Sequence, residues 1–145
     1  GEVRGKEAFD MLQAMNTGHD GSLTTLHANS PSDALNRLET MVLMGGFDIL
    51  IKAVREYIVS AIDLIVNIER MSDGRRKVTS IVELENFSGD EIKLKEIFAF
   101  KQKGLTANGE VDGEFILYGG VPKVYKKIKA RGIHDIDDIF FPEEK

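Results

Sequence analysis

The sequence of 145 residues contains no cysteine and no tryptophan, and it has only three histidines. Without cysteine the chain cannot form a disulfide framework, a zinc finger or a catalytic thiol, and a reducing compartment fits this composition. Apolar runs stay well short of the roughly 20 residues that a membrane-spanning helix needs. The opening GEVRGKEAF does not follow the pattern of a signal peptide, in which a charged region precedes an apolar one.

Positive charge is also in deficit, because 19 basic residues face 24 acidic ones and give a formal net charge of −5. Nucleic-acid-binding proteins neutralise phosphates with a basic face, so we expect no nucleic-acid partner. With 42% apolar and 30% charged residues, the composition is typical of a soluble globular protein. The length predicts one domain, or one domain with an appendage. Since the sequence opens without Met, we expect an excised part of a longer protein.

The first half of the chain has apolar residues at helical spacing. In its best-marked segment, Ser30 stands where a helix N-cap belongs and Pro31 occupies the first helical position. Glycines at 45 and 46 follow the last turn of that segment, and Gly18 follows an earlier one as a helix C-cap. The predicted helices cover residues 7–15, 31–44 and 49–62.

In the second half, the pattern changes to runs that are rich in β-branched and aromatic residues. The Asp-Gly pair at 73–74 is a hairpin signal between the first two runs, and similar dipeptides recur at 108–109 and 112–113. We therefore predict an antiparallel meander of about four strands, then a short helix over residues 122–130 and an acidic tail. The predicted strands cover residues 63–70, 76–85, 91–100 and 113–118.

Two of the histidines, His19 and His27, bracket a short β-prone run at residues 22–27 within the stretch NTGHDGSLTTLHANS. A histidine in such a place often satisfies a loop or lies buried with a hydrogen-bond partner. Together with Asp20 the pair could bind a metal, but their spacing fits no standard site. The third histidine, His134, belongs to no motif.

The segment GEVRGKEAFDMLQAMNTGHDGSLTTLHANSPSDALNRLETMV resembles the signature of the traffic ATPases of secretion and pilus assembly, most closely their Tad/Flp pilus branch. Residues 1–70 carry the resemblance strongly, and residues 71–118 carry it with less specific motifs. The implied fold class is α/β. Residues 1–70 would form the C-terminal half of a RecA-like P-loop NTPase core. Residues 71–145 would form a β-rich appendage, an antiparallel meander with a short C-terminal helix.

The resemblance implies roles for particular residues. Glu2 matches the acid at the end of the Walker B strand, which positions or polarises the attacking water. His27 matches the histidine that senses the terminal phosphate, at the C-terminal end of a core strand over residues 22–27. His19 opens the same histidine box. Arg4 could carry the signal to a neighbouring element, so Arg4, His19 and His27 are the candidate nucleotide-binding residues, and no metal ligand is implied.

The resemblance also implies ATP and Mg²⁺ as cofactors of the full-length protein, and a hexamer that works with an inner-membrane platform protein. It would lie in the cytoplasm, at the inner face of the membrane. The P-loop motif G-x-x-x-x-G-K-[ST] does not occur in these 145 residues. We therefore expect the isolated chain to be inactive. The strand that carries the P-loop would lie between residues 22–27 and residues 64–68.

Two other functions stay open on the sequence. The chain could be an interaction module that docks the ATPase to an inner-membrane partner, which would bind with or without ATP. A P-loop helicase or recombinase would instead show DNA-stimulated turnover, which the negative charge disfavours. Arg37 and Arg55 lie on predicted helices, where solvated positions compete with subunit or phosphate contacts. The RRK run at 75–77 is interpreted as the surface of a hairpin.

Overall fold

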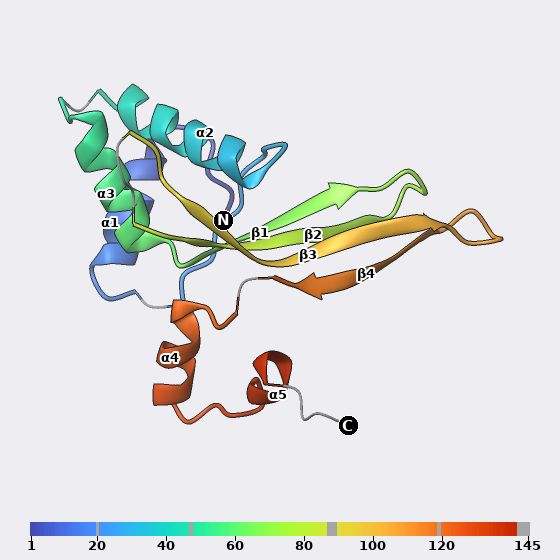
Figure 1. Ribbon diagram of the computed structural model, residues 1–145. Helices are drawn as coiled ribbons and strands as arrows, with labels where there is room; N and C mark the ends of the chain where they lie inside the picture. Colours follow the sequence, from blue (N-terminus) through green and yellow to red (C-terminus); the bar gives the residue numbers. More distant parts are fainter. Residues whose placement is uncertain (20, 47, 87–89, 119, 142–145) are drawn as a thin grey trace.

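The computed structural model describes residues 1–19, 21–46, 48–86, 90–118 and 120–141. Helices α1, α2 and α3 gather at one end of four long strands, whose hairpins project away from them, and α4 and α5 lie apart from these three helices (Figure 1). The elements are α1 (Glu7–Asn16), α2 (Pro31–Met44), α3 (Ile51–Ala61), β1 (Leu64–Arg70), β2 (Arg76–Leu84), β3 (Leu94–Leu105), β4 (Val111–Leu117), α4 (Lys123–Ala130) and α5 (Asp137–Phe140).

The predicted meander is confirmed, because the strands pair antiparallel in the order β1-β2-β3-β4. Gly74 and Gly109 adopt positive φ angles of 82° and 76° in the β1–β2 and β3–β4 turns, where a side chain would be strained. The prediction of a turn at 112–113 is wrong. Gly113 lies inside β4, opposite a bulge in β3 between Gln102 and Gly104.

The predicted helices are confirmed as well, and their apolar stripes form the core. The Ser30 Oγ accepts a hydrogen bond of 3.1 Å from the Asp33 N–H, which caps α2 as its sequence suggests. Between α2 and α3, the Arg55 guanidinium makes two hydrogen bonds, of 2.9 and 3.3 Å, to the Glu39 carboxylate. Arg55 is therefore a half-buried link between helices. The core cluster comprises Val3, Ala8, Leu12, Leu35, Leu38, Met41, Val42, Val54, Ile58 and Leu84.

The prediction of a regular strand over residues 22–27 is wrong. One isolated parallel bridge joins Thr25 to Glu2, with the Val3 N–H donating to the Thr25 carbonyl at 2.8 Å and the Thr25 N–H donating to the Gly1 carbonyl at 3.2 Å. A strand needs a ladder of hydrogen-bonded neighbours, and within the described ranges the backbone bridge of this run joins it to the first few residues of the chain. The other side of the run faces β1 across a groove.

The C-terminal helices attach to the sheet through polar and aromatic contacts. The buried Glu83 carboxylate accepts a hydrogen bond from the Lys123 N–H at the start of α4. The ring centroids of Phe98 in β3 and Phe140 in α5 lie 6.0 Å apart. In the part of the chain that the structure describes, no helix is long and apolar enough to cross a membrane.

Candidate functional site

Three of the four residues singled out from the sequence meet at one place. The Glu2 Oε2 lies 2.5 Å from Arg4 Nη2, and the Glu2 Oε1 lies 3.0 Å from His27 Nε2. We call Glu2, Arg4 and His27 the acid–histidine cluster. The carboxylate is the sheltered member, with 27% of its side chain exposed, whereas 74% of the Arg4 and 81% of the His27 side chain are exposed. The cluster is therefore open to a ligand from solvent.

The cluster forms because the chain start is pinned beside residues 24–25. Val3 is buried in the core, so its neighbours Glu2 and Arg4 point to the opposite side of this extended segment. The Thr24 hydroxyl donates to the Gly1 carbonyl at 2.6 Å, and the bridge at Thr25 fixes the register. His27 comes two residues after Thr25, which brings its imidazole to the Glu2 carboxylate.

Hydrogen bonding and charge set the ionisation of this carboxylate. The hydrogen bond from Arg4 holds the pKa of Glu2 below its ordinary value, against a smaller opposing effect of burial. The charges of Arg4, His27 and Arg37 add to this lowering. The same pairing raises the pKa of Arg4 above its ordinary value. Glu2 is thus ionised near neutral pH, and both of its oxygens act purely as hydrogen-bond acceptors.

The fourth residue, His19, does not join the cluster. It follows α1, and its Nδ1 lies 3.1 Å from the Ala14 carbonyl oxygen, while its own carbonyl accepts a hydrogen bond of 2.7 Å from the Ser22 hydroxyl. The metal interpretation involved Asp20, which lies outside the described residues. Among the residues that are described, no group of three or more His, Asp or Glu side chains could hold a metal ion.

Arg37, for which the sequence left a solvated position and a subunit or phosphate contact open, is a neighbour of the cluster. From α2 its Nη1 donates a hydrogen bond of 2.8 Å to the His27 carbonyl. The available signal was the distance of only ten residues between the two, with a helix cap at Ser30 that folds α2 back toward His27.

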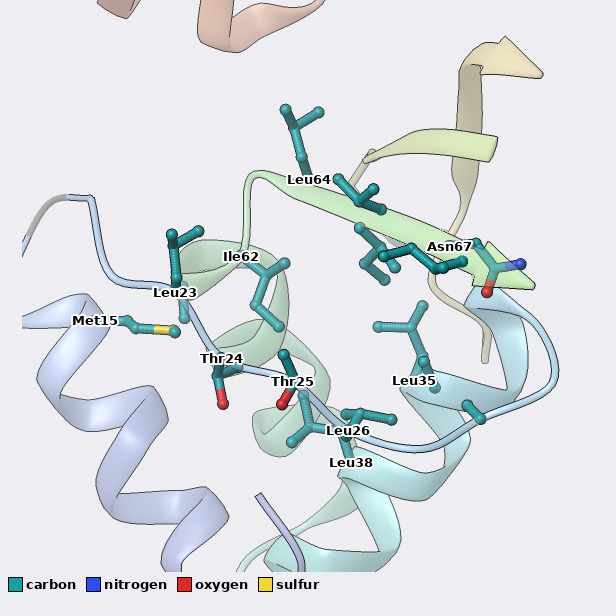
Figure 2. A pocket seen from close by; sticks show the side chains of 16 residues that line it. Met15, Leu23, Thr24, Thr25, Leu26, Leu35, Leu38, Ile62, Leu64 and Asn67 are labelled. Atoms are coloured by element: carbon teal, nitrogen blue, oxygen red, sulfur yellow. The ribbon is translucent and has the colours of Figure 1, made fainter. Parts of the chain in front are cut away.

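A groove of about 410 Å³ runs beside the cluster, between residues 23–28 and β1 (Figure 2). Leu23 and Leu26 lie on one wall, Leu64 on the other, and Leu35 and Leu38 of α2 lie between the walls (Figure 2). Its lining is Met15, Leu23, Thr24, Thr25, Leu26, Ala28, Ala34, Leu35, Leu38, Ala61, Ile62, Leu64, Ile65, Val66, Asn67 and Ile68. The groove is therefore mainly apolar, and one of its walls is the outer edge of β1, which pairs with no further strand among the residues that the structure describes.

Comparison with known proteins finds relatives that are named as conjugal transfer and type IV secretion proteins. Conjugal transfer protein TrbB of Rhizobium radiobacter is 41% identical over 95 residues, which cover 66% of this chain and 28% of the relative. Type IV secretion system protein VirB11 of Bartonella quintana is 40% identical over 102 residues, which cover 67% of this chain and 26% of the relative. The chain thus spans about a quarter of the length of these relatives.

A solved structure is similar too. The crystal structure of the VirB11 ATPase from the Brucella suis type IV secretion system, in complex with sulphate, matches with a TM-score of 0.54 at 30% identity. The match covers 57% of this chain and 26% of that one. It supports part of an ATPase domain with an α/β architecture. A model of the family described as type II/IV secretion system protein matches residues 1–109. The resemblance in the sequence is thereby confirmed, and the chain belongs to the type II/IV secretion system protein family.

Proposed function

We propose that this chain is the C-terminal part of an ATPase that hydrolyses ATP to drive pilus assembly or protein export. The observation that carries the proposal is the 3.0 Å contact between Glu2 and His27, two residues that lie 25 positions apart in the segment matched by the family. A solved relative is named as an ATPase of a type IV secretion system, which supports the same reaction.

In the proposed mechanism, the Glu2 carboxylate orients the attacking water, since phosphoryl transfer depends mainly on positioning and charge stabilisation. Its Oε1 and Oε2 each have two lone pairs, so a water molecule can bind while His27 and Arg4 remain in contact. The Nε2–H of His27 is directed at Glu2, so His27 would donate to the terminal phosphate through Nδ1–H, which requires a proton on both ring nitrogens, and would so distinguish ATP from ADP. Arg4 adds positive charge at the same place.

The residues present fit the phosphate end of a nucleotide. Exposed hydrogen-bond donors of Arg4 and His27 surround one carboxylate, and Arg37 adds a second guanidinium nearby. ATP would supply the phosphoryl bond that is broken, and Mg²⁺ the charge that neutralises its oxygens. The lysine and hydroxyl of a P-loop would have to come from outside these 145 residues. We therefore propose nucleotide turnover for the longer protein only.

The apolar groove supports the proposal of an incomplete RecA-like half. The proposal from the sequence puts the P-loop strand between residues 22–27 and 64–68, and the groove lies between these segments. A strand there would pair with the free edge of β1 and cover the exposed Leu23 and Val66 side chains. We also propose that the full-length protein forms a hexamer, works with an inner-membrane platform protein and belongs to the Tad/Flp branch. Membership of the secretion family supports these proposals.

The proposal is tested in the full-length enzyme with Glu2→Gln and His27→Ala. Glu2→Gln keeps the shape of the side chain but removes its charge, so we expect ATP binding to persist and turnover to fall by about 10²–10³-fold. His27→Ala should also lose turnover, together with the discrimination between ATP and ADP. The measurements are nucleotide affinity by fluorescence and phosphate release.

Glu56→Gln, which removes an exposed carboxylate from α3, is the matched control and should leave turnover unchanged. Hydrolysis at the wild-type rate by Glu2→Gln would contradict the role proposed for Glu2, and the same rate in His27→Ala would contradict that of His27.

A further inference from the structure

Arg37 connects a well-anchored helix to the histidine of the cluster. Its neighbours on α2, Leu35 and Leu38, are buried in the core, so the backbone at Arg37 is held in place. From there the guanidinium reaches back over the cap of α2 and donates to the His27 carbonyl at 2.8 Å. A hydrogen bond from a charged donor is stronger than a neutral one.

His27 depends on such a contact because it lies in a loop. The isolated bridge at Thr25 precedes it, and α2 begins four residues after it at Pro31. Its imidazole contacts Glu2 but is otherwise largely exposed, so packing does little to fix the ring. A residue that holds the backbone at His27 therefore decides whether the ring stays within 3.0 Å of the carboxylate.

The charge of Arg37 also supports the cluster, through its effect on the Glu2 carboxylate. It contributes to the lowered pKa of Glu2, less than the hydrogen bond from Arg4, and so favours the ionised carboxylate. The charged and titratable groups around Glu2 are Arg4, His27 and Arg37, with Glu7 beyond Arg4.

We propose that Arg37 is a positioning residue that holds the His27 imidazole against Glu2 through its hydrogen bond to the His27 carbonyl. The inference rests on the proposed function, because it assigns a part in ATP turnover to a residue that acts through His27. Misplacing a reacting group by about 1 Å can cost as much as 10²-fold in rate. Loss of Arg37 should therefore lower kcat and leave KM for ATP nearly unchanged.

The first test compares Arg37→Met in the wild-type and the His27→Ala backgrounds of the full-length enzyme. In the wild-type background we expect kcat to fall by about 10-fold to 10²-fold, with partial rescue by Arg37→Lys. In the His27→Ala background, Arg37→Met should cause no further loss, because the residue through which it acts is gone. Arg76→Met, which removes an exposed arginine at the start of β2, is the matched control.

An equal fold-loss from Arg37→Met in both backgrounds would indicate a general structural role and overturn the proposal. Unchanged kcat in the wild-type background would overturn it as well. If His27→Ala itself keeps the wild-type kcat, the proposed function has failed at His27, and the next measurement, which needs no turnover, decides on Arg37.

The second test measures the coupling between His27 and Glu2 in the 145-residue chain. The charge of His27 contributes to the lowered pKa of Glu2, so His27→Gln should raise that pKa toward its ordinary value. In the Arg37→Met background the same substitution should raise it by about half as much or less, because the ring is no longer held beside the carboxylate. The pKa is read from the carboxyl carbon of labelled Glu2 by NMR. An equal rise in both backgrounds, or no rise in either, would overturn the proposal.

Discussion

A carboxylate that accepts a hydrogen bond from an arginine and lies near further positive charge stays charged over a wider range of pH than a free one. Glu2 gains this property from residues on three segments: Arg4 beside it, His27 after the bridge, and Arg37 on α2. The chain thereby keeps a strong hydrogen-bond acceptor in a place that solvent can reach. Such a group orients water without being neutralised, which is the chemical requirement of the proposed reaction.

Asp73 shows the same principle in a structural role. Its Oδ2 accepts a hydrogen bond of 2.8 Å from the Val111 N–H and its Oδ1 one of 3.0 Å from the Arg75 N–H, so it ties the turn between β1 and β2 to the start of β4. These bonds, chiefly the one from Val111, hold the pKa of Asp73 below its ordinary value of 3.8.

Because the folded-state pKa is lowered, the stabilisation by Asp73 is fully present above the ordinary pKa and is lost as pH falls through the lowered value. Asp73→Asn should therefore unfold at a lower temperature than the wild type at pH 7, and the gap should close in strong acid. Thermal unfolding followed across pH measures the gap. Asp112→Asn, on the exposed side of β4, should show no such gap at pH 7. A gap for Asp73→Asn that persists at the lowest pH would contradict the assignment.

Individual site residues were predictable to different degrees. Glu2 and His27 are part of local motifs, so their identity could be inferred from their neighbours in the sequence. Their mutual contact depends on the bridge at Thr25, a pairing between distant segments that no local pattern specifies. For Arg37 the sequence left a solvated position and a subunit or phosphate contact open, because its hydrogen bond goes to a backbone carbonyl ten residues away, which no local pattern specifies.

Among the elements, β4 contains a position that only glycine can occupy. A Cβ on Gly113 would lie 2.5 Å from the Lys101 carbonyl oxygen and 2.6 Å from Phe100 Cζ. Gly113→Ala should therefore destabilise the sheet by about 1–3 kcal/mol, the usual cost of overpacking, as measured by urea denaturation. Gly104→Ala is the matched control, because a Cβ on Gly104 meets nothing within 4 Å. Equal stability of the two variants would show that the strands separate at no cost.

The elements also explain where prediction from sequence succeeded. Residues 31–44 could be predicted as a helix to the residue because the cap, the proline and the final glycines are all local signals. The Asp-Gly dipeptide at 112–113 is typical of a turn, yet it lies inside β4. Glycine is needed there because the bulged strand β3 leaves no room for a Cβ. The run at 22–27 has the composition of a strand, but a strand forms only where partners exist on its edges.

For the whole molecule, the open groove predicts association. Leu23 is 91% exposed and lies beside the unpaired edge of β1, so two copies can cover these surfaces by pairing with each other. We expect the isolated chain to self-associate in sedimentation experiments, with amide exchange faster before residue 63 than in residues 63–118.

Leu23→Glu should shift the chain toward the monomer, because charge at an exposed edge opposes pairing. Leu105→Glu, at an exposed apolar position of the distant hairpin, is its control and should leave the association unchanged. A monomeric wild-type chain with slow amide exchange throughout would contradict this prediction. It would mean that the first 62 residues form a stable packed structure without a second chain.

Helix α2 has a mechanical consequence. Its 14 residues make a stiff rod of about 21 Å, gripped at Glu39 by Arg55 of α3 and joined through Arg37 to the loop of His27. A rod fixed in this way transmits displacement without bending. Arg37 and Glu39 lie only two residues apart on this rod, so a displacement of α3 would be passed directly to the His27 carbonyl and would change the distance between the imidazole and Glu2.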